Sequence, residues 1–289
     1  MDHKPPVGAP NGAPPELTEE QRQRFEALRA RMEEEHRVRA ALLPLFQAHE
    51  YRDGDFTMPY RFFAPENLEP GKQYPIVIFL HGLGESGTDN AGQVVNNEGA
   101  AIWVADQQAG GEPCFVLAPQ CPDPNEPDPK PGEAPVRWTT PALTGVLAVL
   151  DALEKEYPID PARRYVTGLS LGGYGSWMLN AMAPDKFAAV VSCCPACLAG
   201  GGIYQEGIER SLPALLHKPL WMFHAADDGM VPVEISRRMK LALEAAGEVR
   251  DRDFFYTEYP AELHYNHFCW GAAYGDPSLR RWLLAQRQG

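Results

Sequence analysis

The chain has 289 residues, of which 44% are hydrophobic and 22% are charged, a composition typical of one or two globular domains. Its 26 Lys and Arg against 39 Asp and Glu give a net charge of −13, and a surface this acidic disfavours binding to nucleic acid or anionic lipid. No apolar run reaches the roughly 20 residues that span a bilayer, and the N-terminus lacks the apolar core of a secretory signal. We therefore expect a cytoplasmic protein with no membrane partner.

The N-terminal part is expected to lie outside the main domain. Residues 1–17 contain five prolines and two glycines, which is typical of a disordered tail. Thr18-Glu-Glu-Gln21 then has the capping-box pattern of a helix start. Apolar residues recur at helical spacing after it, so we predict a helix to about Leu43, within a helical extension of residues 18–50.

From residue 51 onward, short β-rich apolar runs alternate with helical segments. Strands are expected at 60–64, 76–80, 114–118, 164–168, 188–193, 220–224 and 254–257, and helices at about 97–108, 141–156, 172–183, 233–246 and 277–286. This alternation implies a mostly parallel sheet with helices on both faces. We therefore predict a single α/β domain over residues 51–289.

One long segment interrupts this alternation. Pro119 to Pro141 contains eight prolines, and Trp138 is its only strongly apolar side chain. The segment is predicted to be an irregular loop that leaves the C-terminal end of a strand. Open α/β sheets place ligands at that end, so the loop either borders a ligand site or is a solvated excursion.

The chain has six cysteines, too few in a chain of this length to indicate a disulfide scaffold. Cys194-Pro-Ala-Cys197 has the spacing of a redox pair or of half a metal site. No second pair and no nearby pair of histidines completes a zinc site. The favoured interpretation is that small apolar thiols end a buried strand, and no metal site is predicted.

The most informative segment is Gly168-Leu-Ser-Leu-Gly172, which lies between a predicted strand and a predicted helix. In a nucleophile elbow the chain turns so sharply that the serine hydroxyl protrudes, and the positions two residues before and after it need glycine. The free N–H groups of the following helix favour negative charge at the turn. We therefore predict that Ser170 is a nucleophile.

A serine nucleophile needs a base, and the base needs a carboxylate that precedes it in this kind of fold. Asp227 and Asp228 both follow the strand at 220–224, while His264 and His267 both follow the last strand. Spacing alone does not separate the members of either pair. His217 and His224 are interpreted as structural.

The reaction also needs two backbone N–H groups that face the developing oxyanion. One would come from Leu171, directly after the nucleophile. The other would come from the glycine-rich loop His81-Gly-Leu-Gly-Glu-Ser-Gly87, which follows a buried strand. Leu83 is the candidate there, although the loop could be a plain turn.

Three segments together resemble the α/β-hydrolase superfamily: Tyr60-Arg-Phe-Phe-Ala-Pro-Glu-Asn67, His81–Gly87 and Gly168-Leu-Ser-Leu-Gly-Gly-Tyr-Gly175. The resemblance is closest to phospholipase/carboxylesterase-like and polyhydroxybutyrate-depolymerase-like enzymes, which shade into prolyl-oligopeptidase-like "predicted peptidases" and feruloyl esterases. It covers residues 55–287, so residues 1–50 lie outside it. It implies an α/β-hydrolase fold.

The resemblance also implies a choice within each pair of candidates. The family pattern His-Gly-x-x-Asp-x-x-Val-Pro is similar to His224-Ala-Ala-Asp-Asp-Gly-Met-Val-Pro232, and this alignment implies Asp228 as the acid. Ala225 departs from the family's glycine. The family's base often stands in His-x-x-Trp, which matches His267-Phe-Cys-Trp270 and implies His267 as the base.

The implied activity is hydrolysis of a small carboxylic ester through a Ser170-His267-Asp228 acyl-enzyme mechanism, with Leu83 and Leu171 binding the oxyanion. No cofactor and no metal are implied. One alternative is a peptidase of the prolyl-oligopeptidase-like type, which is disfavoured because the sequence has no propeller-sized domain to gate peptides. The other is a non-catalytic binding protein with the same fold. Four aromatic residues could line a substrate pocket: Trp138, Tyr174, Trp177 and Trp270.

Overall fold

The computed structural model describes residues 19–122 and 138–288. The expected tail and most of the proline-rich segment lie outside these residues. The chain divides into two compact units, one up to Val38 and one from Arg39 onward. Helix α1 (Glu19–Leu42) agrees with the predicted N-terminal helix.

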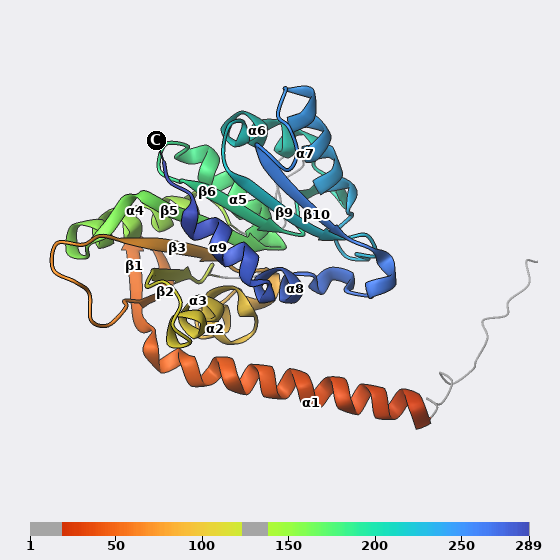
Figure 1. Ribbon diagram of the computed structural model, residues 1–289, viewed down its shortest axis with the longest axis horizontal. Helices are drawn as coiled ribbons and strands as arrows, with labels where there is room; N and C mark the ends of the chain where they lie inside the picture. Colours follow the sequence, from red (N-terminus) through yellow and green to blue (C-terminus); the bar gives the residue numbers. More distant parts are fainter. Residues whose placement is uncertain (1–18, 123–137, 289) are drawn as a thin grey trace, which may run out of the picture. The chain divides into compact units, whose positions relative to one another are not determined.

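The second unit is built on one eight-stranded sheet with the order β1-β2-β4-β3-β5-β6-β9-β10 (Figure 1). Strands β1 and β2 are antiparallel to their neighbours, whereas the pairs from β4 to β10 are parallel. The strands are β1 (Gln47–Asp53), β2 (Phe56–Phe63), β3 (Tyr74–Leu80), β4 (Phe115–Pro119), β5 (Ile159–Leu169), β6 (Ala189–Cys193), β9 (Leu220–Ala225) and β10 (Phe254–Tyr259). The predicted mostly parallel α/β sheet is confirmed.

The central strands are apolar because both faces of the sheet are covered. Every residue of β3, β4 and β6 is buried. Alternate side chains of β3 enter opposite cores: Ile76 and Ile78 pack in one, and Val77 and Phe79 in the other. This period of two is the pleat of a strand between two hydrophobic layers.

Helices cover both faces of the sheet (Figure 1). One core contains residues of α4 (Thr140–Glu156), α5 (Leu171–Met182), α6 (Gln205–Leu215) and α7 (Glu234–Ala245). The other contains residues of α2 (Gly92–Val95), α3 (Glu98–Gln108), α8 (Trp270–Gly275) and α9 (Pro277–Ala285). The five predicted helices of the domain correspond to α3, α4, α5, α7 and α9.

Several elements were not predicted. Strand β1 begins at Gln47, before the expected domain boundary at residue 51, because its sequence QAHEYRD is a polar, exposed edge strand without an apolar run. Helix α6 contains Gly207 and Pro213, both of which weaken a helical pattern. The short helices α2 and α8 and the two-residue strands β7 (Leu198–Ala199) and β8 (Gly202–Ile203) were also missed.

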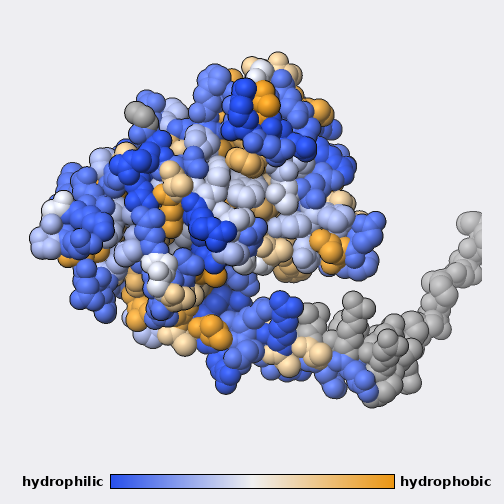
Figure 2. Space-filling model, viewed as in Figure 1, coloured by the Kyte–Doolittle hydropathy of each residue, from blue (hydrophilic) through white to orange (hydrophobic). Residues whose placement is uncertain are grey.

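The exterior is mainly hydrophilic in the view of Figure 2, where apolar residues occur as small separate groups. None of the described helices combines the length and hydropathy that a membrane span requires.

Candidate active site

Ser170 lies in a sharp turn between β5 and α5. Its φ is 53° and its ψ is −118°, a conformation that an L-residue adopts only where its surroundings impose it. The residue is buried, at 8% exposure. This is the strand–turn–helix arrangement that the Gly-x-Ser-x-Gly pattern predicts.

Two glycines make the turn possible. A Cβ atom added to Gly168 would lie 2.1 Å from the carbonyl oxygen of Gly172, and one added to Gly172 would lie 1.9 Å from the carbonyl oxygen of Leu80. Both distances are far inside van der Waals contact with rigid backbone. Any larger residue at either position would therefore force α5 away from β3 and β5.

Three side chains from distant parts of the chain meet at this turn. The Ser170 hydroxyl donates to His267 Nε2 at 2.9 Å, and His267 Nδ1–H donates to Asp228 Oδ2 at 2.8 Å. Asp228 follows β9, and His267 lies in the 3₁₀ turn Asn266–Phe268 after β10. Because β5, β9 and β10 are parallel, their C-terminal ends meet at one edge of the sheet.

The Asp228 carboxylate is held in its charged form. Its side chain is fully buried, which by itself would raise its pKa, but hydrogen bonds from His224, His267 and the N–H of Val231 lower the pKa well below its usual range. Oδ1 accepts the N–H groups of Met230 and Val231 at 2.9 and 2.8 Å. A fixed negative charge therefore faces the imidazole of His267.

The two alternative residues lie elsewhere. Asp227 Oδ1 accepts the N–H of Asn266 at 3.1 Å, so this carboxylate anchors the turn that carries His267 without touching its ring. His264 is exposed and adopts a left-handed conformation with a φ of 54° at the end of the turn Ala261–Leu263. The structure therefore brings together Ser170, Asp228 and His267 from the predicted sets.

The two predicted oxyanion residues lie on either side of the serine. Leu171 is the first residue of α5, and the first N–H groups of a helix have no acceptor within the helix. Leu83 begins the turn Leu83–Glu85. A Cβ added to its neighbour Gly82 would lie 3.5 Å from the Cβ of Ser170, so this loop passes directly beside the nucleophile.

His81 fixes that loop, a role that the sequence analysis missed. Its ring is fully buried, and Nε2 accepts the N–H of Cys121 at 2.8 Å. Nδ1 therefore carries the hydrogen and donates to the Gly82 carbonyl at 2.6 Å. Burial lowers the pKa of His81 to about 4, so the ring is neutral at pH 7. Trp138 adds a third anchor, because its Nε1–H donates to the His81 carbonyl at 3.0 Å.

Three of the four aromatic residues predicted to line a pocket are buried instead. Trp138, Tyr174 and Trp177 are exposed by 1%, 3% and 0%, so they offer no surface to a substrate in this structure. Their burial identifies all three as core residues. Trp270 is half-buried, and the centroid of its ring lies 5.3 Å from that of His267.

Exposed apolar side chains adjoin the residues of the site. Phe268, next to His267, is 63% exposed; Met230, two residues after Asp228, is 68% exposed; and Leu83 is 48% exposed. Large apolar side chains with this exposure around a reactive serine are typical of a surface that binds an apolar group.

All six cysteines are buried, and Cys114, Cys193, Cys194, Cys197 and Cys269 are free thiols. Burial raises the pKa of Cys197 to about 12 and that of Cys194 well above its usual value, which disfavours thiolate chemistry. In the described part of the chain, one set of possible metal ligands comes within 4.8 Å: Cys194, Asp228 and His267. The hydrogen bond from His267 to Asp228, and that from the Cys194 thiol to the His267 carbonyl at 3.5 Å, explain this proximity.

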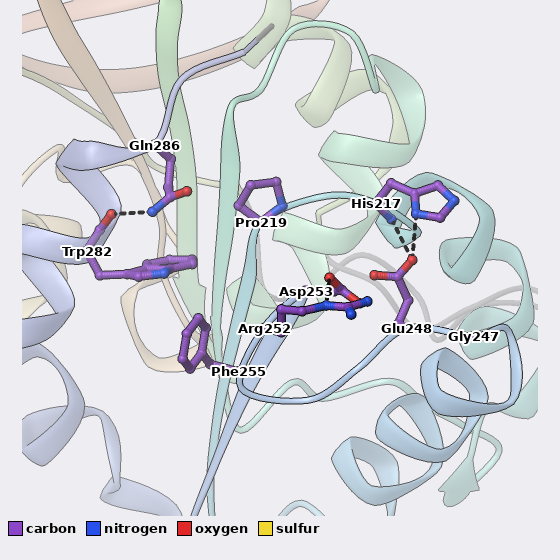
Figure 3. A pocket seen from close by; sticks show the side chains of 9 residues that line it. All are labelled: His217, Pro219, Gly247, Glu248, Arg252, Asp253, Phe255, Trp282 and Gln286. Atoms are coloured by element: carbon purple, nitrogen blue, oxygen red, sulfur yellow. Dashed lines mark hydrogen bonds and ion pairs between the residues drawn. The ribbon is translucent and has the colours of Figure 1, made fainter.

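Figure 3 shows a separate cavity of about 400 Å³, which is lined mainly by residues that precede β9 and β10. It lies at the N-terminal ends of these parallel strands, whereas Ser170 follows the C-terminal end of β5. Its acidic groups are paired: Glu248 Oε1 lies 2.7 Å from His217 Nδ1, and Arg252 donates to Asp253 at 2.7 Å. The cavity is thus unrelated to the serine site.

The chain is similar to known esterases. Residues 130–246 match the Esterase family model, described as "Putative esterase". A probable feruloyl esterase C of Aspergillus terreus is 32% identical over 179 residues, which is 61% of this chain and 56% of that protein.

Solved structures extend the likeness to the fold. The crystal structure of a thermostable esterase is 36% identical and superposes with a TM-score of 0.71, covering 85% of this chain and 64% of that one. A ferulic acid esterase of Anaeromyces mucronatus shares the fold at 14% identity, with a TM-score of 0.58 over 83% and 90% of the chains. The chain spans less than two thirds of the first two relatives. The chain has the fold of the α/β-hydrolase esterases and is similar to them in sequence.

The two histidines after β10 can be tested with a fluorophosphonate probe, which reacts with activated serines. We expect His267→Asn to slow labelling of Ser170 by about a thousandfold, because the base is lost. His264→Asn is the matched control, since asparagine tolerates the left-handed backbone of His264. Equal labelling rates in the two variants would refute the assignment of His267.

The two adjacent aspartates give a second comparison with the same probe. Asp228→Asn should slow labelling by about 10³- to 10⁴-fold, because the amide no longer stabilises the charged imidazole in its working tautomer. Asp227→Asn keeps an oxygen that can accept from Asn266, so we expect a change of less than about tenfold. The opposite ranking would transfer the role of acid to Asp227.

Proposed function

We propose that this protein is a serine hydrolase that cleaves carboxylic esters through an acyl-enzyme. The observation that carries the proposal is the line of hydrogen bonds from Ser170 through His267 to Asp228. The esterase family match and the two esterase relatives support an ester as the substrate.

In the first half of the reaction, Ser170 Oγ attacks the ester carbonyl while His267 Nε2 takes the hydroxyl proton. Charge develops on the carbonyl oxygen, which the N–H groups of Leu83 and Leu171 stabilise. The C–O bond then breaks as His267 returns the proton to the departing alcohol. The serine is left acylated.

In the second half, water replaces the alcohol. The oxygen of the water attacks the acyl carbon while His267 takes a proton from the water. His267 then passes this proton to Ser170 Oγ as the acid leaves. Asp228 stays charged throughout. It holds the imidazole in the tautomer whose Nε2 lone pair faces the serine, and it stabilises the imidazolium in each transition state.

The exposed aromatic surface beside the base indicates the substrate class. The ring centroids of Phe268 and Trp270 lie 5.0 Å apart, and both rings adjoin that of His267. Such a pair would pack against a flat aromatic group of the ester. The relatives from Aspergillus terreus and Anaeromyces mucronatus are named as feruloyl or ferulic acid esterases. We therefore propose esters of aromatic acids, including hydroxycinnamates.

The proposal predicts that the purified protein hydrolyses short-chain p-nitrophenyl esters and that Ser170→Ala abolishes turnover. The same preparations should leave peptide p-nitroanilides intact, which separates an esterase from a peptidase of the same fold. Fluorophosphonate labelling at Ser170 separates an enzyme from a non-catalytic binding protein. Undiminished ester turnover in Ser170→Ala, or faster cleavage of the anilides, would contradict the proposal.

A second prediction concerns the aromatic surface. Phe268→Ala should raise KM for methyl ferulate by about tenfold, because an aromatic contact is worth about 0.5–1.5 kcal/mol in addition to the buried area. It should leave kcat/KM for p-nitrophenyl acetate within about threefold. Leu241→Ala is the control, because Leu241 has a similar exposure of 60% on α7. A KM for methyl ferulate equal to that of the control would exclude Phe268 from the binding surface.

A further inference from the structure

A second buried histidine, His224, contacts the same carboxylate oxygen of Asp228 as His267 does. His224 lies near the end of β9 and is 0% exposed. Its Nε2 is 3.0 Å from the carbonyl oxygen of Val231 and 3.3 Å from Asp228 Oδ2. His224 takes no part in the proposed proton transfers.

The contacts of the ring define its tautomer. A carbonyl and a charged carboxylate can only accept, so Nε2 carries a hydrogen shared between Val231 and Asp228. Nδ1 lies 2.8 Å from Ser236 Oγ on α7. In the neutral ring Nδ1 has only a lone pair, so the Ser236 hydroxyl donates to it. Ser236 is itself 0% exposed.

We propose that Ser236 and His224 form a positioning pair that orients the Asp228 carboxylate and limits its basicity toward His267. The inference rests on the proposed function, because it assigns the pair to the same reaction. His224 and Ser236 touch neither substrate nor the reacting atoms. They act through Asp228, and the chain of contacts runs from α7 through β9 to the nucleophile.

The geometry of the carboxylate explains why a second donor matters. Oδ1 is held by two backbone N–H groups, whereas Oδ2 accepts from both His267 and His224. While both histidines donate to Oδ2, the negative charge on this oxygen is shared between two hydrogen bonds. Without His224, Oδ2 would have one side-chain donor in a buried site, and its hydrogen bond to His267 would strengthen.

Two other titratable groups near His224 and Ser236 carry no uncompensated charge. Glu258 lies opposite His224 in the β9–β10 register, and it accepts two hydrogen bonds from Arg237 at 2.6 and 3.0 Å. The Cys194 thiol lies near Asp228 and His267, but burial keeps it protonated. His267 and Asp228 are therefore the groups whose titration should respond to His224.

The sign of the expected effect follows from this competition. A carboxylate that has lost the His224 donor stabilises the protonated form of His267 more strongly. Protonated His267 cannot accept the serine proton, so the acid limb of the kcat/KM profile should move to higher pH. The carboxylate is also freer to rotate, which lowers kcat, because small misplacements of catalytic groups cost up to about a hundredfold.

The experiment compares His224→Leu, His224→Gln and Ser236→Ala with the wild type on p-nitrophenyl acetate, with rates normalised to the serines that a fluorophosphonate titrates. His224→Leu should lower kcat by about tenfold or more and move the acid limb upward by about one pH unit. His224→Gln keeps an N–H donor and should stay close to the wild-type profile. Ser236→Ala should give a smaller shift in the same direction.

Ser211→Ala is the matched control, because Ser211 is also buried in a helix, where its hydroxyl donates to the Gly207 carbonyl. Its acid limb should not move. A purely structural role for His224 would lower the melting temperature and the titratable fraction while leaving the normalised rate and the acid limb unchanged, and that result overturns the inference.

A measurement without substrate keeps the inference separate from the proposed function. ¹⁵N NMR of the imidazole rings should show the Nε2–H tautomer for His224 in the wild type and in His267→Asn. The Nδ1–H tautomer would overturn the inference even if the protein hydrolyses esters. If the wild type hydrolyses no ester, the proposed function fails while the tautomer still reports on the pairing of His224 with Asp228.

Discussion

The approach of α5 to the ends of β3 and β5 is the constraint on which the site depends. The Gly172 backbone packs so closely on the Leu80 carbonyl that no side chain fits between them. This contact forces the chain to reverse within one residue, and Ser170 takes the positive φ that results. The cost of that conformation, of order 1–3 kcal/mol, is offset by the two buried cores on either side of the sheet. In a regular strand of this sheet the side chain would instead point into one of the two buried cores.

The same constraint places the remaining groups. Because β3, β5, β9 and β10 run in one direction, the loops that follow them meet at one edge, where the chain can supply an oxyanion loop, a nucleophile, an acid and a base from four separate segments. Hydrogen bonds between the loops then fix their mutual positions. Asp227 holds the turn that carries His267, and His81 holds the glycine-rich loop to Cys121, two residues after β4. The parallel sheet thus provides rough proximity, and these polar contacts provide the alignment that the proposed acyl transfer requires.

Sequence patterns predicted those parts of the protein whose structure is determined by residues close together in the chain. The apolar runs predicted the central strands, and the glycines around Ser170 predicted the elbow, because the close approach leaves no other residue type. The choice between two neighbouring loop residues could not be made in this way. Asp227 and Asp228 differ by one position, and the direction of each side chain depends on backbone contacts made by residues 230, 231 and 266. The preference for Asp228 and His267 therefore came from family resemblance. Edge strand β1 was missed because a strand exposed to water needs no apolar pattern.

Three buried histidines show most clearly what sequence could not distinguish. His81, His224 and His267 are each at most 5% exposed, yet their hydrogen-bond partners differ. A backbone N–H makes His81 an acceptor at Nε2, two acceptors make His224 a donor at Nε2, and a carboxylate at Nδ1 leaves the Nε2 of His267 free to take a proton from serine. Since a neutral imidazole has one donor and one acceptor nitrogen, the first partner of each ring determines what its other nitrogen can do. Chemical role in this protein is therefore a property of the partners that the fold supplies. Our proposal for His224 follows from one such partner, because His224 and His267 both contact Asp228 Oδ2.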